Sequence, residues 1–190
     1  MSEGVRTIAV ISAGAAGRSI AHAAALGGYR TILEDILPTS LRRAEDEIRE
    51  SLNRAVELGA VGEEDARAAV GRLEYATTLE DAAREADMVI EAVPEEFDSK
   101  EEIFRLLDRV CRPGTVLITN TSSLNVAEIA AVTERPQMIA GMRFVKSAHG
   151  FERIDVVRAP KTAEATLAAA FDAAKRMAKE TTVIDESAVK

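Results

Sequence analysis

The sequence predicts an α/β fold in which a doubly wound, mostly parallel β-sheet is covered by helices. Short apolar runs rich in β-branched residues alternate along the chain with longer amphipathic segments, as they do in successive βαβ units. The clearest runs are apolar at nearly every position, which is typical of strands buried on both faces. Neither a linker nor an internal repeat divides the sequence, so we expect one domain over residues 1–190.

The elements can be placed in order along the chain from these patterns. The strands are expected at the short apolar runs, residues 5–11, 29–33, 86–92, 115–119, 138–142, 154–157 and 181–184. The helices are expected where residues are small or follow a helical period, at residues 15–26, 38–58, 63–73, 96–110, 126–132 and 163–178. Gly27-Gly28 and Pro113-Gly114 follow two of these helices and are typical helix-end signals.

Composition narrows the classes of partner. The formal net charge is −8, which disfavours nucleic acid and anionic membranes as partners because both are negatively charged. No apolar stretch approaches the ~18 residues of a membrane span, and the N-terminus lacks the basic and apolar regions of a signal peptide. We therefore expect a cytoplasmic protein. Cys111 is the only cysteine and precedes a helix-end signal, so we interpret it as a structural thiol.

A glycine-rich turn between the first strand and the first helix carries the main functional signal. Residues 12–17 match the dinucleotide fingerprint G-x-G-x-x-G, with Ser12 in the first glycine place. The first position makes a tight turn, Gly14 lets the backbone approach a pyrophosphate, and Gly17 lets the helix pack closely on the sheet. The predicted cofactor-binding residues of this loop are Ser12, Gly14, Ala15, Ala16 and Gly17.

The second expected strand ends at Glu34-Asp35, at the spacing where a carboxylate accepts hydrogen bonds from the adenosine ribose. Loop and carboxylate together predict a Rossmann-type domain that binds a dinucleotide. Asp35 favours NAD over NADP, because a 2′-phosphate would face a negative charge. We expect NAD as the cofactor and no metal site.

Four stretches resemble the NAD-binding domain of L-3-hydroxyacyl-CoA dehydrogenases. They are residues 12–22 (SAGAAGRSIAH), 92–100 (AVPEEFDSK), 120–124 (NTSSL) and 141–157 (GMRFVKSAHGFERIDVV). The NTSSL block after a strand, followed by a G-M-x-F strand, is specific to this family and its near relatives. The resemblance extends from residue 6 to about residue 185.

The resemblance implies roles for individual residues. Asp35 would hold the ribose, Glu95 and Lys100 would lie beside the cofactor, and Ser122 would touch both nicotinamide and substrate. Ser51, on the long second helix, would meet coenzyme A. The implied substrate is therefore an acyl-CoA-type small molecule. Family members continue into a helical domain that closes the acyl-CoA cleft and builds a homodimer. That C-terminal helical domain is absent from this sequence, which reads Asp185-Glu186-Ser187-Ala188-Val189 where the family has D-x-P-G-F.

The chain departs from the family at the catalytic positions. The family uses the histidine of H-F-F-N-P as general base, and a glutamate twelve residues later orients it. Here the histidine, asparagine and glutamate places hold Arg143, Lys146 and Asp155. Arginine stays protonated in proteins and cannot act as a base. Ser122, Arg143 and Asp155 are thus degenerate catalytic positions, and Lys146 takes a cofactor-side place. We expect Arg143 and Asp155 to form an ion pair within ~4 Å.

Three functions remain open from the sequence. The first is an NAD-dependent 3-hydroxyacyl-CoA dehydrogenase domain of fatty-acid metabolism, impaired by Arg143 and the missing second domain. The second is a non-catalytic NAD-binding homologue. The third is a related dehydrogenase for an anionic substrate, which Arg143 and Lys146 would suit. His149 is a candidate for a relocated base, whereas His22 is interpreted as structural.

Overall fold

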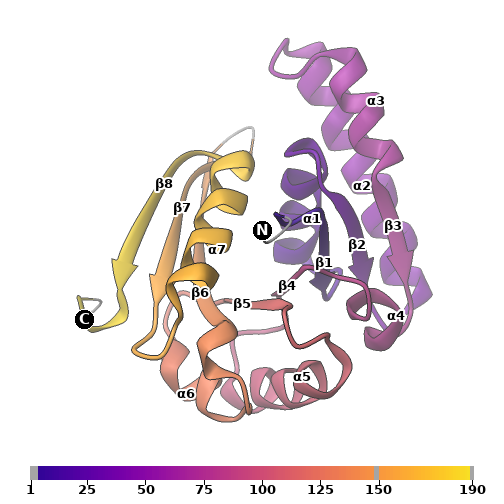
Figure 1. Ribbon diagram of the computed structural model, residues 1–190. Coiled ribbons are helices and arrows are strands. Elements are labelled where there is room, and N and C mark those ends of the chain that lie inside the picture. The colour runs from indigo at the N-terminus through magenta and orange to yellow at the C-terminus, as the bar shows by residue number, and fades with distance from the viewer. Residues whose placement is uncertain (1–3, 148–149, 189–190) are drawn as a thin grey trace.

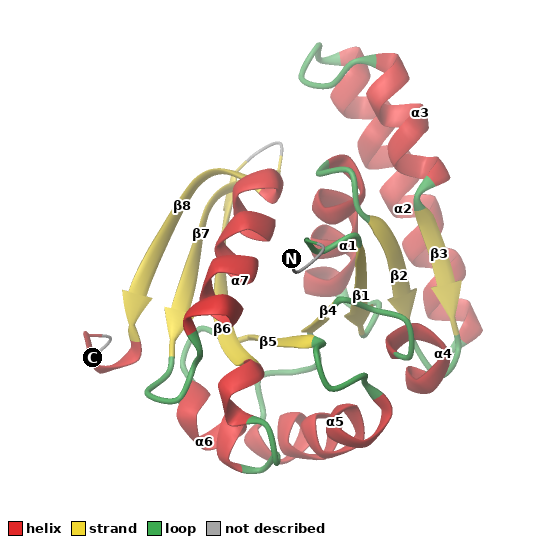
Figure 2. Ribbon diagram, in the orientation of Figure 1, coloured by secondary structure: helices red, strands yellow, loops and turns green. Residues whose placement is uncertain are grey.

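The computed structural model describes residues 4–147 and 150–188 and contains one mixed sheet with helices on both faces (Figures 1 and 2). Within these residues the sheet has eight strands in the order β3-β2-β1-β4-β5-β6-β7-β8. Their bounds are β1 (Thr7–Ile11), β2 (Arg30–Glu34), β3 (Leu73–Ala76), β4 (Met88–Glu91), β5 (Val116–Asn120), β6 (Ile139–Ser147), β7 (Gly150–Arg158) and β8 (Ala178–Asp185). Neighbouring strands are parallel except for the antiparallel pair β6–β7, which confirms the predicted fold class.

The helices lie between the strands in the expected alternation. Their bounds are α1 (Ala15–Leu26), α2 (Pro38–Glu57), α3 (Glu63–Gly71), α4 (Leu79–Ala83), α5 (Phe97–Val110), α6 (Val126–Ala131) and α7 (Glu164–Met177), with short 3₁₀ turns η1 (Pro136–Met138) and η2 (Glu186–Ala188). Helices α1 and α7 cover one face of the sheet, and α4, α5 and α6 cover the other (Figure 1).

Two apolar cores explain why β1 is apolar at nearly every position. Ile8 and Val10 pack into the core under α1 and α7, whereas Ala9 and Ile11 pack into the core under α4, α5 and α6. Because successive strand residues point to opposite faces, a strand covered on both sides needs apolar residues at both sets of positions. Cys111 is buried in the second core, and burial raises the pKa of its thiol to about 11, as suits a structural thiol.

Three parts of the fold differ from the sequence-based expectation. The edge strand β3 and the short helix α4 were not expected, because β3 is only partly buried and α4 has five residues. Strand β6 is longer than expected and pairs with β7 as far as Ser147, and β7 begins at Gly150, four residues before the expected run. Strand β8 begins three residues early, since its pairing with β7 starts at Ala178.

The sheet reverses its winding between β1 and β4. The chain leaves β1 into α1 on one face and leaves β4 into α5 on the opposite face. A crevice forms at such a switch point beyond the carboxyl ends of the strands, and open α/β sheets bind their ligands there. The glycine-rich loop after β1 and the segment after β4 therefore meet at the same place.

Candidate functional site

The glycine-rich loop makes the tight turn that the sequence predicted. Ser12 has a φ of +84°, in the left-handed region, and is the only non-glycine residue with positive φ in the described part of the chain. Its N–H donates to the carbonyl of Glu34 at 2.9 Å, which ties the loop to the end of β2. A side chain in this conformation costs roughly 1–2 kcal/mol relative to glycine. The substitution of serine for glycine thus leaves the turn in place but strained.

Gly17 is required by close packing between the loop and α1. A Cβ built on Gly17 would lie 1.8 Å from the carbonyl oxygen of Ser12, a distance that no side chain can occupy. Gly14 has more room, since the nearest atom to its Cβ would be Ser12 Oγ at 3.6 Å. Helix α1 begins after Gly14 without a side-chain cap and without an acidic residue in its first turn. Its first N–H groups therefore suit an anion such as a pyrophosphate.

Asp35 follows β2 directly, and backbone N–H groups hold its carboxylate in place. Oδ2 accepts from the N–H of Ala13 at 2.9 Å, and Oδ1 accepts from the N–H of Leu37 at 3.0 Å. The preceding Glu34 is buried, and burial, with the nearby Asp35 charge, raises the pKa of its carboxyl. Asp35 thus lies at the end of β2 beside the loop, the position from which a carboxylate can accept hydrogen bonds from a ribose.

A pocket of about 410 Å³ lies at the carboxyl ends of β1, β4 and β5. It brings together most of the residues predicted for the cofactor: Ser12, Gly14, Ala15, Ala16, Glu95 and Ser122, with Ala92, Val93, Pro94 and Asn120. Three features together fit a dinucleotide. They are the uncapped backbone N–H groups at the start of α1, the close packing of the loop at Gly17, and the pocket at the switch point. Asp35 borders the loop but does not line this pocket.

Glu95 is the one carboxylate among the described residues that line this pocket, and it accepts several hydrogen bonds. Its Oε1 accepts from Thr121 Oγ1 at 2.5 Å, from the N–H groups of Ser122 and Ser123 at 2.9 and 3.1 Å, and from Ser123 Oγ at 3.1 Å. Burial opposes ionisation, but these hydrogen bonds and the Lys100 charge outweigh it and lower the pKa of Glu95 to about 2. The ionised carboxylate holds the turn that presents the exposed Ser122 to the pocket.

Lys100 is placed differently from the contact that the resemblance implies. Its side chain is 0% exposed, and its ammonium donates to Glu91 and to the carbonyl of Asn120. It therefore lies beneath the pocket instead of lining it. Its partner Glu91 was missed from the sequence, although a glutamate that ends an otherwise apolar strand run was a visible signal.

The predicted ion pair between Arg143 and Asp155 is wrong. The two residues lie directly opposite each other on β6 and β7, as expected. However, the Asp155 carboxylate accepts from Arg153 Nε at 2.7 Å and from Thr182 Oγ1 at 2.6 Å. Arg153 lies on the same strand and the same face, and Thr182 is the neighbour of Asp155 on β8, so both reach the carboxylate first. Nε of Arg143 is buried and has no hydrogen-bond partner among the described residues.

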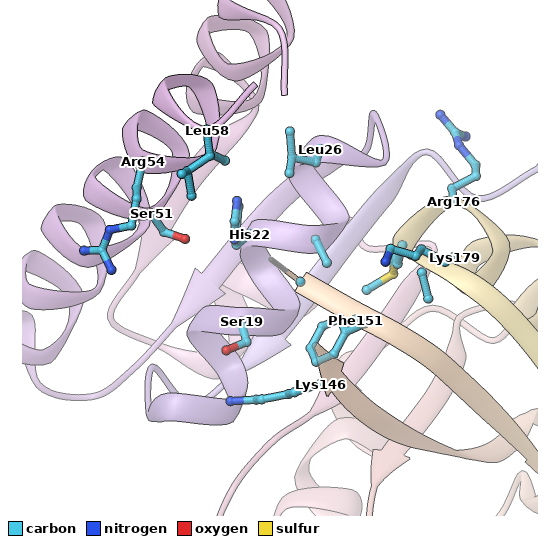
Figure 3. Close-up of a pocket in the computed structure, with 15 residues that line it drawn as sticks. Ser19, His22, Leu26, Ser51, Arg54, Leu58, Lys146, Phe151, Arg176 and Lys179 are labelled. Atoms are coloured by element: carbon cyan, nitrogen blue, oxygen red, sulfur yellow. The ribbon is translucent and has the colours of Figure 1, made fainter. Parts of the chain in front are cut away.

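Lys146 and Ser51 line a second pocket of about 480 Å³ (Figure 3). Arg143 is not among the residues that line it. Figure 3 shows Lys146 extending from the strand toward the start of α1, and Ser51 on the neighbouring helix α2. Arg143 follows Met142, which packs into the core under α1 and α7, so Arg143 points to the opposite face of the sheet. The structure therefore separates Arg143 from Lys146, which the anion interpretation had combined.

His22 lines the same second pocket, and His149 lies outside the described residues. His22 Nε2 is buried without a hydrogen-bond partner among the described residues, and burial lowers the pKa of its imidazole. At the other end of the chain, the carboxylate of Glu186 accepts from the N–H groups of Val126 and Ala127. The segment after β8 thus returns to the start of α6.

In residues 4–147 and 150–188, no helix is both long and apolar enough to cross a membrane. The same residues contain no cluster of three or more histidine, cysteine or acidic side chains that could hold a metal ion.

Comparison with known proteins agrees with this geometry. The family model described as "3-hydroxyacyl-CoA dehydrogenase, NAD binding domain" matches residues 7–187. A probable 3-hydroxybutyryl-CoA dehydrogenase of Bacillus subtilis (strain 168) is 35% identical over 182 residues, covering 96% of this chain and 63% of that protein. A 3-hydroxyadipyl-CoA dehydrogenase of Escherichia coli (strain K12) is 38% identical over 159 residues, covering 84% of this chain and 33% of that protein.

A solved structure shows the same fold. The crystal structure of 3-hydroxybutyryl-CoA dehydrogenase from Escherichia coli K12 superposes with a TM-score of 0.91 at 33% identity, covering 97% of this chain and 39% of that chain. The present chain therefore spans less than two thirds of the length of these relatives. The matched family model, the loop after β1 and the pocket at the switch point lead to one conclusion: the chain belongs to the 3-hydroxyacyl-CoA dehydrogenase family and comprises its NAD-binding domain.

Proposed function

We propose that residues 1–190 act as a cofactor-binding unit that holds NAD(H) but carries no general base at the family's catalytic position. When bound, NAD would accept a hydride from a substrate carbon. The N–H groups at the start of α1 would bind the pyrophosphate, and Asp35 would accept hydrogen bonds from the adenosine ribose. Glu95 would keep Ser122 oriented toward the nicotinamide side of the pocket.

The second part of the proposal, that the catalytic position lacks a general base, rests on Arg143 and Asp155. Oxidation of a hydroxyl group needs a base, and the guanidinium of Arg143 stays protonated at neutral pH. Asp155 cannot replace it, because its carboxylate is already bound by Arg153 and Thr182. Loss of a general base typically costs about 10²–10⁴-fold in rate. NAD binding and slow or absent dehydrogenation are therefore expected together.

The test measures binding and turnover on the same protein. NADH and NADPH are titrated by fluorescence, and oxidation of 3-hydroxybutyryl-CoA is then followed through NADH formation. We expect NADH to bind and turnover to remain near background. Arg143→His alone should not restore full activity, because Arg153 still holds Asp155 and Lys146 still replaces the family's asparagine. Turnover of the unchanged chain above ~1 per second, an ordinary enzymatic rate, would refute the proposal and point to His149.

An acyl-CoA-type ligand is proposed for the second pocket. Ser51 lies there with four basic side chains, those of Arg54, Lys146, Arg176 and Lys179, and basic groups suit the phosphates of coenzyme A. We expect Ser51→Ala to weaken binding of acetoacetyl-CoA without changing NADH affinity, and equal acetoacetyl-CoA affinity would argue against this placement. A homodimer and a cytoplasmic location also remain proposals, to be tested by light scattering and by imaging of a tagged protein.

One observation favours a different substrate, an anion bound by Arg143. The buried Nε of Arg143 has no partner among the described residues, and an unpaired guanidinium is suited to a carboxylate. If so, 3-hydroxybutyrate as the free acid should bind in the presence of NADH, and Arg143→Met should abolish that binding. Lys161→Met is the matched control, because Lys161 is exposed and lines neither of the two pockets. Equal loss in both variants, or no binding to the unchanged chain, would exclude this alternative.

A further inference from the structure

A fully buried ion pair lies directly beneath the cofactor pocket. Glu91 is the last residue of β4, and Lys100 lies in the first turns of α5; both side chains are 0% exposed. The Lys100 ammonium donates to Glu91 Oε1 at 2.8 Å, to Glu91 Oε2 at 3.0 Å and to the carbonyl of Asn120 at 2.7 Å. The Glu91 carboxylate and the Asn120 carbonyl therefore hold the ammonium below the pocket.

Glu91 also binds two further groups at the pocket floor. Its Oε1 accepts from the N–H of Val93 at 2.7 Å, and its Oε2 accepts from Thr119 Oγ1 at 2.8 Å. One carboxylate thus joins the segment after β4, the end of β5 and helix α5. Glu91 holds Val93 directly and holds Asn120 through Lys100. Both of these residues line the cofactor pocket.

A second carboxylate competes for the same ammonium. Glu95 Oε2 lies 3.5 Å from Lys100 Nζ, while Glu95 Oε1 holds the turn at Thr121, Ser122 and Ser123. When Glu91 is ionised, its negative charge balances that of the Lys100 ammonium. The Glu95 carboxylate then binds the turn at Thr121, Ser122 and Ser123. With Glu91 neutral, the full attraction of the buried ammonium would fall on Glu95 and draw its carboxylate away from the serine N–H groups.

We propose that Glu91 is a positioning residue for the nicotinamide side of the cofactor pocket, acting through Lys100 on Asn120 and Glu95. The inference rests on the proposed binding of NAD(H). A buried ion pair is often no more stabilising than a well-packed apolar pair of similar size, so stability alone is a weak reason for placing one here. The geometric consequence of the ion pair is specific, because its contacts with Asn120 and Glu95 fix the position and orientation of the turn that carries Ser122.

The proposal predicts a selective effect within the cofactor. ADP-ribose contains the adenosine, the pyrophosphate and the second ribose but lacks nicotinamide, so its affinity depends mainly on the α1 loop and Asp35. Glu91→Gln should weaken NADH binding by roughly tenfold, the value of one charge-assisted hydrogen bond, and leave ADP-ribose affinity unchanged. An equal loss for both ligands would mean general distortion and would overturn the proposal.

Two further variants separate positioning from stability. Glu91→Gln leaves an uncompensated buried ammonium, whereas the double variant Glu91→Gln/Lys100→Met removes both charges and should recover thermal stability. NADH affinity should stay low in the double variant although no ammonium then draws Glu95 away, because the Asn120 carbonyl has lost its donor and the pocket floor is no longer joined to α5. Recovery of NADH affinity together with stability would overturn the proposal. Glu91→Asp keeps the charge but shortens the reach, and should lose NADH affinity while remaining folded.

The control lies on the same helix. Glu101 forms an exposed pair with Arg105, and Glu101→Gln should change neither stability nor NADH affinity, because such pairs contribute little. If the unchanged chain binds ADP-ribose but not NADH, the nicotinamide pocket itself is refuted and Glu91 has nothing to position. If the unchanged chain binds NADH and the folded Glu91 variants bind it equally well, only the role of Glu91 is refuted.

Discussion

Replacing Gly17 with alanine should lower the free energy of unfolding of the domain, whereas the same replacement at Gly14 should change it little. In Gly17→Ala the new Cβ would lie 1.8 Å from the Ser12 carbonyl oxygen, well below the 3.4 Å at which ordinary van der Waals contact begins. In Gly14→Ala the nearest atom is 3.6 Å away and φ is −64°, a conformation that alanine adopts readily.

The size of the effect follows from what can move. The Ser12 carbonyl cannot easily rotate away, because Ser12 is held in the left-handed region with its N–H bonded to Glu34. Helix α1 would have to shift as a whole against its apolar core. Overpacking of this kind costs about 1–3 kcal/mol and sometimes more, so we expect about 3 kcal/mol. For a domain of this size that lowers Tm by about 6–12 °C. Gly14→Ala should change stability by less than about 1 kcal/mol.

Thermal and urea unfolding, with and without NADH, test this pair. Both variants should lose the extra stability that saturating NADH gives the unchanged chain by mass action, because both alter the surface that receives the pyrophosphate. Only Gly17→Ala should also be less stable without NADH. A Tm for Gly17→Ala within ~2 °C of the unchanged chain would show that the loop and helix are not as tightly packed as the structure indicates.

Three further predictions concern the same site. Ser12→Gly should relieve the left-handed strain and tighten NADH binding, with Ser12→Ala as the control that keeps the strain; an unchanged Kd for Ser12→Gly would contradict the crowding argument. NADH should bind at least ~10-fold better than NADPH because of Asp35, a difference of about 1.4 kcal/mol, and equal affinities would remove that role. Glu95 should contribute stability that is fully present above its usual pKa of 4.5 and is lost as the pH falls toward about 2. Urea unfolding from pH 6 to pH 3 should therefore show a weaker pH dependence in Glu95→Gln than in the unchanged chain, and identical slopes would count against the depressed pKa.

The parts of the fold that the sequence predicted well are those with local signals. Strand β1, the turn at Ser12 and helix α1 follow from an apolar run, two glycines and a run of small residues. Strand β3 has a weak pattern of its own, and it forms because β2 offers it a free edge. Likewise, β6 extends beyond its apolar run because β7 pairs with it. Such elements depend on partners far away in the sequence, which periodicity does not report.

Some features of the site could be predicted from the sequence and others could not. Motif positions such as Gly14, Glu95 and Ser122 do meet at one pocket. Sequence spacing could not indicate that Lys100 is buried beneath the pocket, nor that Glu91 is its partner. It also could not indicate that Arg153 reaches Asp155 before Arg143 does, because that choice depends on side-chain lengths across three neighbouring strands.

The residues around the cofactor pocket and those at the family's catalytic positions lie on different strands of the sheet. The two groups also differ in whether their charged side chains have partners. On the parallel strands β4 and β5, Glu91, Glu95 and Lys100 form one network in which each charge has a partner. On the antiparallel pair β6–β7, Asp155 is bound by Arg153 and Thr182, and the buried Nε of Arg143 has no partner within residues 4–147 and 150–188. The contacts of Asp155 with Arg153 and Thr182 compete with any hydrogen bond that Asp155 could make to a base on β6. A histidine restored at position 143 would therefore meet an aspartate that already has two donors. Removing Arg153 is consequently as necessary for rebuilding the dyad as replacing Arg143.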